Sequence, residues 1–471
     1  MSPLSPLSLI SPSPHSPHLP ISPSPLLPIL PISPLTFRIV NNINELLTQV
    51  ETSYNAADWS SLIEYLQQLI LGVNSQHPEI VKNREYLLSL CLSMLEIGDF
   101  KQRWEITKVL INLGNIAIPP LIEILKDEDA EEELRWYTAR TLGEFQHPDA
   151  ITVLVELLRN DADEELKKIA ATALGQMGSI AITSLTELLK DEDTRLLAVR
   201  SLCCIPQTET IAPLLSVVQD PQPLIRAAAI EALANFDDER IPAILVNALD
   251  DVAATVRRAA VVGLGFRPDL RQVFDLVTRL QPKLYDINLD VCCAAVVTLS
   301  RMGCDEAAKH LFDLLISPQT PITLQLETIR ALSWMNTPSS LEYLQTAFYQ
   351  SASETIWQEI VTVLGRVQKP QLTTPAAEIL LQILESQHLA TKITNIKSAI
   401  ALSLGQLGKI QAIEPLISLL ADSNASVRLH AIAALKNLDK QAAHQQLQQL
   451  ANNAALTPDL QQGIAIALAE W

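Results

Sequence analysis

From about residue 99 onward, hydrophobic and polar positions repeat a single pattern along the chain. Each unit has an apolar stretch ending in a pair such as Leu157-Leu158, a polar turn, and an Ala- and Leu-rich stretch such as 164–175. Successive polar turns lie 33, 31, 29 and 31 residues apart, at Asp127, Asn160, Asp191, Asp220 and Asp251. Apolar residues spaced three or four apart predict amphipathic helices, so each unit is expected to be a pair of helices.

Local signals mark where these helices begin and end. Proline stands at the start of several first helices, as at Pro120, where its missing N–H leaves no hydrogen bond unmade. An acidic residue at the turn caps the second helix. Glycines follow the second helices, where we expect a left-handed backbone, at Gly175, Gly178, Gly405 and Gly408. Two short amphipathic helices cannot bury their faces alone, so neighbouring pairs must stack into an all-α superhelical solenoid.

Both ends of the chain depart from this repeat. Residues 1–36 contain 11 Pro, 9 Ser, 8 Leu and 4 Ile, which predicts a disordered Pro/Ser-rich tail. Residues 37–98 are expected to form an atypical helical N-terminal cap, followed by the solenoid over 99–440. A strong helix start at Thr457-Pro458-Asp459 places a C-terminal helical cap in residues 441–471.

Three repeats share an arginine six residues after the aspartate of the turn. These pairs are Asp220 and Arg226, Asp251 and Arg257, and Asp422 and Arg428. Together with the Ala-x-Ala-Leu-Gly-x-Met-Gly run over 171–178, they resemble the short HEAT-like repeat of the phycobilisome-lyase type. The resemblance implies a HEAT-like α-α solenoid in which Asp and Arg of adjacent repeats form a hydrogen-bonded structural ladder. The resemblance also implies a function. The chain would be either a subunit of a phycobilin lyase or isomerase, or a phycobilisome-associated factor for assembly or degradation.

The charge of the chain is concentrated in one region. With 53 acidic and 34 basic residues the formal charge is −19, which argues against nucleic acid as a partner. Residues 127–193 hold 17 acidic and 6 basic side chains, a net charge of −11. Thirteen of these acids gather at three successive turns, namely Asp127, Glu128, Asp129, Glu131, Glu132, Glu133, Asp161, Asp163, Glu164, Glu165, Asp191, Glu192 and Asp193. Helix capping and solubility explain part of this excess, and docking of a basic partner is the functional interpretation.

Residues suited to catalysis are sparse. The eight histidines are scattered, and the chain has no P-loop, nucleophile elbow or dinucleotide fingerprint, so we expect no catalytic residue, metal or cofactor. The doublets Cys203-Cys204 and Cys292-Cys293 are the one reactive-looking feature. Adjacent helical residues point about 100° apart, so a doublet chelates a metal poorly. Small apolar core residues are therefore our interpretation, with thiol chemistry or an iron–sulfur role as the alternative.

Targeting signals are also lacking. No positive charge precedes Arg38, and no uncharged apolar run approaches the ~20 residues that span a bilayer, which predicts a cytoplasmic protein without a membrane span. The sequence thus predicts a non-catalytic scaffold that binds another protein. The alternative is a phycobilin lyase-like enzyme or phycobilisome factor with a phycobiliprotein as its partner. Binding of a coloured bilin would separate the two.

Overall fold

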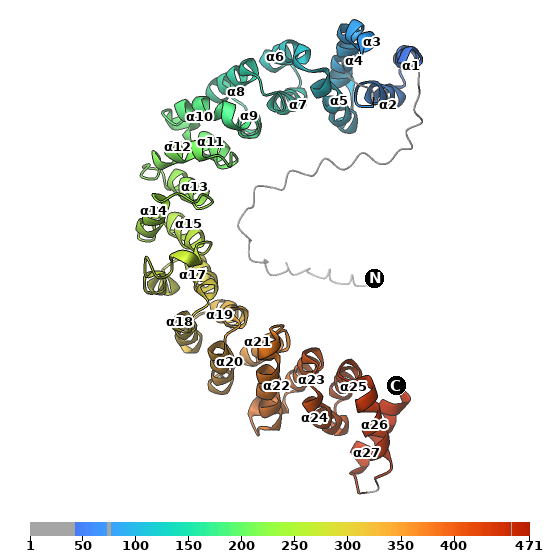
Figure 1. The fold of residues 1–471 in the computed structure, drawn as a ribbon, viewed down its shortest axis with the longest axis vertical. Helices are drawn as coiled ribbons and strands as arrows, with labels where there is room; N and C mark the ends of the chain where they lie inside the picture. The colour runs from blue at the N-terminus through green and yellow to red at the C-terminus, as the bar shows by residue number, and fades with distance from the viewer. Residues whose placement is uncertain (1–42, 73–76, 454) are drawn as a thin grey trace, which may run out of the picture. The chain divides into compact units, whose positions relative to one another are not determined.

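The computed structural model describes residues 43–72, 77–453 and 455–471, so the predicted tail over 1–36 lies outside the described residues. The described residues form 27 α-helices, eight short 3-10 helices and no strand (Figure 1). The prediction of an all-α fold is therefore confirmed. The chain divides into two compact units, which are described separately. The division falls between Pro213 and Leu214, within α12 (Ile211–Leu215).

The first unit begins with four helices that do not follow the repeat and continues with helix pairs. In α6/α7, α8/α9 and α10/α11, the first helix packs on the second, and second helices pack on one another from α5 to α11. The helices are α1 (Ile43–Asn55), α2 (Trp59–Ile70), α3 (Pro78–Lys82), α4 (Arg84–Ile97), α5 (Phe100–Leu113), α6 (Ile118–Lys126), α7 (Glu132–Gly143), α8 (Pro148–Asn160), α9 (Glu164–Gln176), α10 (Ile182–Leu188) and α11 (Glu192–Cys203), with η1 (Asn115–Ala117), η2 (Gly178–Ala181) and η3 (Thr208–Thr210).

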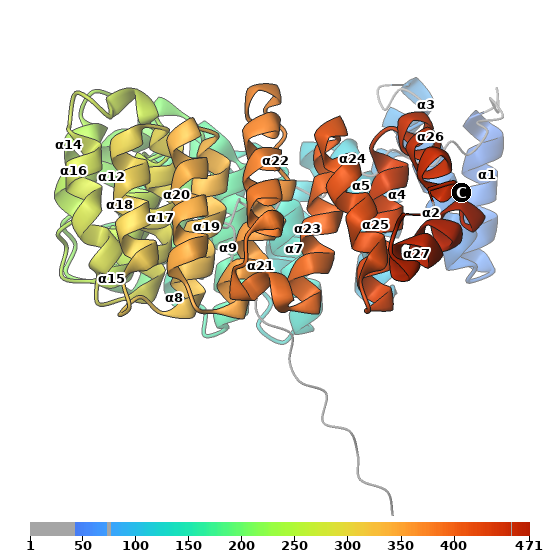
Figure 2. The ribbon, with the colours of Figure 1, turned by 90° about the horizontal axis from the view of Figure 1, so that it is seen from below.

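The second unit continues the same arrangement, and Figure 2 shows its helices standing side by side. The odd-numbered helices α13 to α25 are the second helices, and each packs on the next. The helices are α13 (Pro223–Leu233), α14 (Ile241–Ala248), α15 (Ala254–Leu264), α16 (Leu276–Leu280), α17 (Leu289–Met302), α18 (Asp305–Ile316), α19 (Ile322–Met335), α20 (Pro338–Gln350), α21 (Glu354–Gly365), α22 (Pro370–Glu385), α23 (Thr394–Leu407), α24 (Ile413–Ser418), α25 (Ala425–Asn437), α26 (Lys440–Ala451) and α27 (Pro458–Ala469), with η4 (Pro268–Leu270), η5 (Gln281–Tyr285), η6 (Leu389–Lys392), η7 (Ile410–Ala412) and η8 (Leu419–Ala421).

Glycines near the ends of the second helices have two different roles. Gly178 and Gly408 have φ angles of +71° and +68°, the left-handed backbone expected from the sequence. That expectation is wrong for Gly175 and Gly405, which lie inside α9 and α23. A Cβ at Gly405 would stand 2.7 Å from the Cα of Ala434 in α25. These two glycines therefore allow adjacent second helices to approach closely.

At three such contacts, a hydroxyl group completes the approach. The carbonyl four residues before the glycine accepts a hydrogen bond from a Ser or Thr of the next second helix. In α21 and α23, for example, Ser403 Oγ donates to the carbonyl of Val361 at 3.0 Å, beside Gly365. The other two sets are Gly175 with Ser201 and Ala171, and Gly265 with Thr298 and Val261. A side-chain hydroxyl thus satisfies a backbone carbonyl between neighbouring helices.

The C-terminal end closes on two helices, α26 and α27. Ile464 is fully buried, as the sequence predicts, and Leu468 is half-buried. Trp471 stacks on His444 with ring centroids 5.4 Å apart. Within the part of the chain that the structure describes, no single helix has the length and apolarity to cross a membrane, and one sharply bent pair, 100–113 with 115–126, passes that test by length and composition.

Candidate functional site

A ladder of polar contacts joins neighbouring repeats near the start of several second helices in the second unit. Arg226 Nε and Nη2 donate to the two carboxylate oxygens of Asp251 at 2.9 and 2.7 Å. Its Nη1 donates to the carbonyl of Asp220, at its own turn. Arg257 repeats this geometry with Asp286 and with the carbonyl of Asp251. Each arginine therefore closes its own turn and binds the next.

These contacts shift the pKa values of the aspartates. The hydrogen bonds from Arg226 hold the pKa of Asp251 below its ordinary value, against the opposing effect of burial. Arg257 lowers the pKa of Asp286 in the same way. Both carboxylates are thus held in the charged form by the neighbouring repeat.

The third predicted pair, Asp422 and Arg428, has another geometry. Arg428 Nη1 donates to the backbone carbonyls of Asp422 and Ser423 at 2.8 and 3.0 Å. The side chain of Asp422 instead pairs with Lys397 of the preceding second helix. Lys397 therefore occupies the position that arginine holds in the other rungs.

We call the residue that aligns with Arg226 in each repeat of the second unit the ladder position. It is occupied by Arg226, Arg257, Cys292, Gln325, Trp357, Lys397 and Arg428. In three of these repeats the side chain is uncharged. Cys292 Sγ contacts the carbonyl of Asp286 at 3.1 Å, Gln325 donates to Leu315 at 2.9 Å, and Trp357 Nε1 donates to Phe348 at 3.0 Å. Burial raises the pKa of Cys292, and raises that of Cys293 to about 11. The first cysteine of this doublet thus serves as a neutral hydrogen-bonding residue of the stack.

In the first unit, the ladder uses some of the acids that the sequence analysis assigned to a partner. Arg103 contacts Glu131 and Glu133 at 2.6 and 3.1 Å. Arg135 pairs with Asp161, and its Nε donates to the carbonyl of Leu125 at 3.2 Å. Neither arginine was predicted from the sequence. Arg103 lies four residues after Asp99, and Arg135 lies six residues after Asp129 but follows a leucine, where the three predicted pairs have isoleucine or valine.

The four acids of the middle turn, Asp161, Asp163, Glu164 and Glu165, already have partners within the chain. Asp163 caps α9 through the N–H groups of Glu165 and Leu166, and accepts a hydrogen bond from Trp136 Nε1 at 3.0 Å. The Trp136 hydrogen bond is the main cause that lowers the pKa of Asp163. Glu164 and Glu165 pair with Lys167 and Lys168. This turn therefore carries little uncompensated charge.

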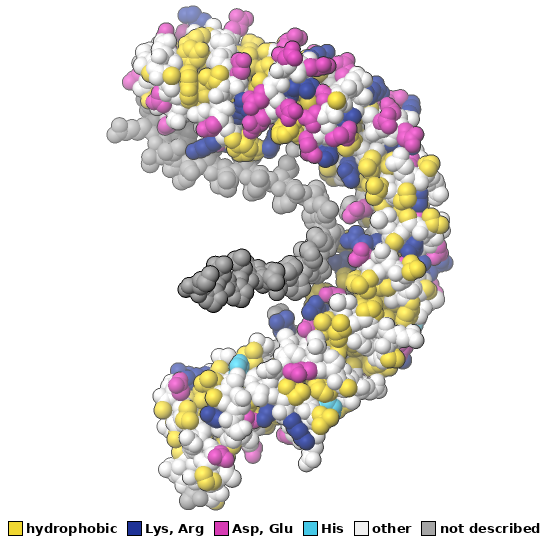
Figure 3. Space-filling model, turned by 180° about the vertical axis from the view of Figure 1, so that it is seen from behind, with side chains coloured by type: hydrophobic (Ala, Val, Ile, Leu, Met, Phe, Trp, Pro, Cys, Tyr) yellow, Lys and Arg dark blue, Asp and Glu magenta, His cyan; other side chains and the backbone are white. Residues whose placement is uncertain are grey.

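The first and third turns keep their charge. Eight of the thirteen carboxylates form no ion pair with any residue in the described ranges; Asp163 is half-buried, and the other seven residues are exposed. These seven are Asp127, Glu128, Asp129, Glu132, Asp191, Glu192 and Asp193. Asp127 and Asp191 also accept backbone hydrogen bonds within their turns, from Asp129 and Asp193. Figure 3 shows acidic side chains gathered over this part of the first unit. We call these seven residues the acidic surface.

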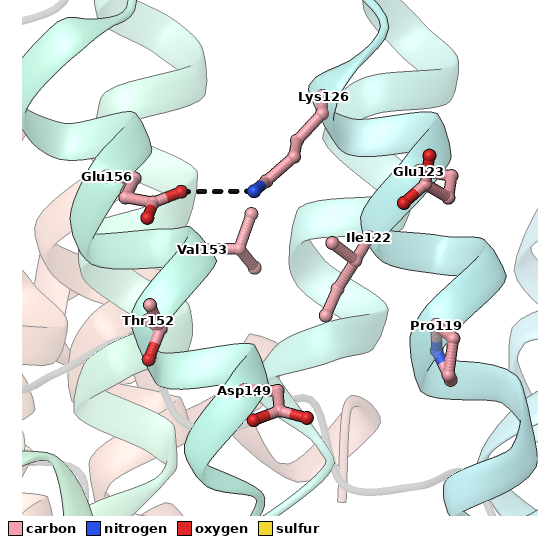
Figure 4. Close-up of a pocket in the computed structure, with 8 residues that line it drawn as sticks. All are labelled: Pro119, Ile122, Glu123, Lys126, Asp149, Thr152, Val153 and Glu156. Carbon is pink, nitrogen blue, oxygen red and sulfur yellow. Dashed lines mark ion pairs between the residues drawn. The ribbon is translucent and has the colours of Figure 1, made fainter.

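An open groove adjoins this surface between α6 and α8 (Figure 4). Its lining includes the carboxylates of Glu123, Asp149 and Glu156 and a single cation, Lys126. Lys126 pairs with Glu156 across the groove at 3.3 Å, and Ile122 and Val153 form its apolar part. The groove therefore adds uncompensated negative charge beside the first acidic turn.

Side chains that could ligate a metal are dispersed in the described ranges. No group of three or more His, Cys, Asp or Glu residues there is arranged to hold a metal ion. Cys203 and Cys204 are exposed residues. The sulfur of Cys204 is nevertheless partly desolvated, which raises the pKa of this thiol. Binding through the exposed carboxylates is what this arrangement can do.

Comparison with known proteins gives a family model and a set of solved structures. The model for HEAT repeats matches residues 118–196, 182–265 and 386–469. No curated protein matches the sequence. In a structure of Kap95p binding to RanGDP, the match has 14% identity and a TM-score of 0.52, and covers 81% of this chain and 60% of that one. In the Kap95:Nup1 complex, it has 15% identity, a TM-score of 0.54 and the same coverage.

This chain thus spans 60% of the length of the Kap95 chains that it matches. At these identities, the likeness establishes the fold alone. The complex of CpcE and CpcF of phycocyanin lyase from Nostoc sp. matches with 19% identity and a TM-score of 0.29, and covers 49% of this chain and 93% of that one. A TM-score this low carries no argument about this chain.

Proposed function

We propose that this chain, which is a HEAT-like repeat protein, is a non-catalytic scaffold that binds another protein, and that its acidic surface docks a basic surface of that partner. The observation that carries the proposal is the set of seven exposed carboxylates without an ion-pair partner in the described ranges. One capping acid at each turn suffices to begin a helix. Clustered like charges repel one another, so the excess costs stability unless a partner compensates it.

Two further observations support the proposal. The groove between α6 and α8 offers three carboxylates and one lysine, a setting that suits an inserted Lys or Arg side chain of the partner. Stacked helical repeats present long surfaces that suit protein ligands. The Kap95 structures with a similar fold are described as binding RanGDP and Nup1, which are proteins.

A test of docking should change only acids that have no structural partner in the chain. Reversal at Glu131, Glu133, Asp161 or Asp163 would break the ladder or a cap and confuse folding with binding. The informative variant carries Glu128→Lys, Asp129→Lys, Glu132→Lys and Glu192→Lys. A matched control reverses four exposed acids of the same unit that lie outside the acidic surface, namely Glu45, Glu51, Glu64 and Glu85. Both variants change the charge equally, so their difference reports on position.

The experiment begins with proteins captured from the native organism by the full chain and identified by mass spectrometry. One captured protein is then purified, and its association rate is measured at two salt concentrations. We expect association to slow as salt screens the charges, the Debye length being about 8 Å at physiological ionic strength. The surface variant should bind more weakly than the control variant. Equal binding by both variants, with no effect of salt, would show that the acids serve only capping and solubility.

A further inference from the structure

One position near the C-terminal end of the second helices stands out in the second unit. It lies nine residues after the ladder position. At the ends of α15, α17, α19 and α21, which pack on one another in that order, it carries alternating aromatic and arginine side chains. These are Phe266, Arg301, Trp334 and Arg366, which we call the aromatic–arginine row. The same position in the flanking repeats carries neutral amides, at Asn235, Gln406 and Asn437.

The row is open to solvent. Phe266 is 51% exposed and Trp334 is 63% exposed, and both arginines are exposed. The guanidinium carbon of Arg301 lies 4.8 Å from the centre of the Phe266 ring, a cation–π contact that holds the arginine over the aromatic face. Exposed aromatic residues beside arginines have the composition of binding hot spots.

The charges of the row are uncompensated. Neither Arg301 nor Arg366 forms an ion pair with any residue that the structure describes. Arg330, one turn before Trp334, contrasts with them because it pairs with Glu327 and Glu359 at 2.8 and 2.7 Å. Asp305, close to Arg301 in the sequence, instead accepts a hydrogen bond from Ser339. The two arginines are therefore available to the carboxylates of a partner.

The spacing of the row selects the shape of that partner. Packed helices lie about 8–10 Å apart, so the backbones of successive members of the row are separated by roughly that distance. The Arg301 side chain reaches back toward Phe266, to 4.8 Å from its ring centre. A polyproline II segment rises about 3.1 Å per residue with three residues per turn, which places every third side chain on one face about 9 Å from the last. A β-strand presents every second side chain on one face, about 7 Å apart, and so does not match this spacing.

We infer that the aromatic–arginine row binds an extended acidic segment of another protein, in which apolar and acidic side chains alternate at every third residue. The apolar side chains contact Phe266 and Trp334, and the carboxylates receive bidentate hydrogen bonds from Arg301 and Arg366. The site lies in the other unit from the acidic surface and attracts the opposite charge. The inference therefore does not depend on the proposed docking of a basic partner.

The test uses the full chain and a fluorescent peptide with Leu and Glu alternating at every third position of a proline host. We expect saturable binding by fluorescence anisotropy. The Arg301→Ala/Arg366→Ala double variant should weaken it about tenfold or more, as should Gln in place of Glu in the peptide. Trp334→Ala should also weaken it. The matched controls are Gln406→Ala, at the same position of a flanking repeat, and Arg279→Ala, an exposed arginine outside the row. Both should bind the peptide like the unaltered protein.

Several outcomes would overturn the inference. One is equal binding by the double variant and the controls, with helicity and melting temperature unchanged in all. Another is tighter peptide binding after removal of residues 1–36, which would assign the row to the chain's own N-terminal segment. A third is a change of oligomeric state in the double variant, which would assign the row to a second copy of the chain. Charge reversal on the acidic surface should leave peptide binding unchanged.

Discussion

The guanidinium of Arg226 binds both carboxylate oxygens of Asp251, a residue 25 positions later at the turn of the next repeat. The Arg226 side chain is 10% exposed and that of Asp251 is 17% exposed. Because the same arginine also holds the carbonyl of Asp220, two consecutive turns are fixed by one side chain. The contact thus links neighbouring repeats where their packed apolar faces alone would permit sliding.

Loss of this arginine should lower stability. Arg226→Ala or Arg257→Ala leaves a largely buried aspartate without its partner, so we expect the free energy of unfolding to fall by about 1–3 kcal/mol in urea titrations. The control is Arg240→Ala, because this side chain is 52% exposed and pairs with Asp238 of its own turn, so that it joins no repeats. Its loss should change stability little. Equal effects of the three substitutions would contradict a structural ladder.

The same ladder predicts how stability depends on pH. The pKa values of Asp251 and Asp286 are lowered in the folded chain by Arg226 and Arg257. A lowered pKa stabilises the fold above the unfolded value, which is about 3.9 for Asp, and this contribution is lost as the pH falls below about 4. The free energy of unfolding, measured by urea titration between pH 3 and 7, should therefore fall at the acid end. Arg257→Ala should show a shallower fall, and a parallel curve for this variant would refute the linkage.

The sequence predicted the helical repeat well because the apolar period and the turn residues are local features. The ladder was recognised from the spacing of aspartate and arginine within one repeat, and the resemblance implied that the contact joins adjacent repeats. In the structure, Arg226 and Arg257 each bind the acid of the following turn. The separation from arginine to acid is 25 residues for Arg226 and 26 for Arg135, and this longer spacing is the signal that would have found Arg135. No spacing in the sequence marks Cys292 and Trp357 as members of the ladder. Both side chains contact backbone carbonyls, which every residue has, and not a particular acid.

The acidic surface was predicted only in outline for a related reason. Net charge along a sequence does not distinguish a carboxylate that pairs with the preceding repeat, such as Glu131, from one that faces solvent, such as Glu132. The aromatic–arginine row was not predicted, because its members are separated by 35, 33 and 32 residues and become neighbours only when the helices stack. If the repeats are aligned on the ladder position, the four members of the row fall in one column, nine residues later.

The close approach of second helices predicts a cost for added volume at Gly365. A Cβ there would lie 2.5 Å from Ser403, so Gly365→Ala should lower the free energy of unfolding by about 1–3 kcal/mol. Gln406→Ala, at an exposed site of α23, is the control and should be near neutral. In the double variant Gly365→Ala/Ser403→Gly, the loss should be smaller than the sum of the two single losses, because the overlap is removed. Additive losses would show that the two helices do not press on each other there.

Thiol labelling tests the interpretation of the cysteine doublets. Cys91 and Cys292 are buried and Cys293 is half-buried, whereas Cys203 and Cys204 are exposed. Burial raises the pKa of Cys91, Cys292 and Cys293, which keeps these thiols protonated and slow to react at neutral pH. The pKa of Cys204 is raised as well, but its exposed position leaves this thiol open to the reagent. With a maleimide on the native chain, mass mapping should find Cys203 and Cys204 modified first, at a rate that rises with pH, and Cys91 and Cys292 modified only in denaturant. Cys204→Ser is the matched control and should remove one fast site while leaving the slow sites slow. Rapid native labelling at Cys292 or Cys293 would contradict the structural role and favour thiol chemistry at that doublet.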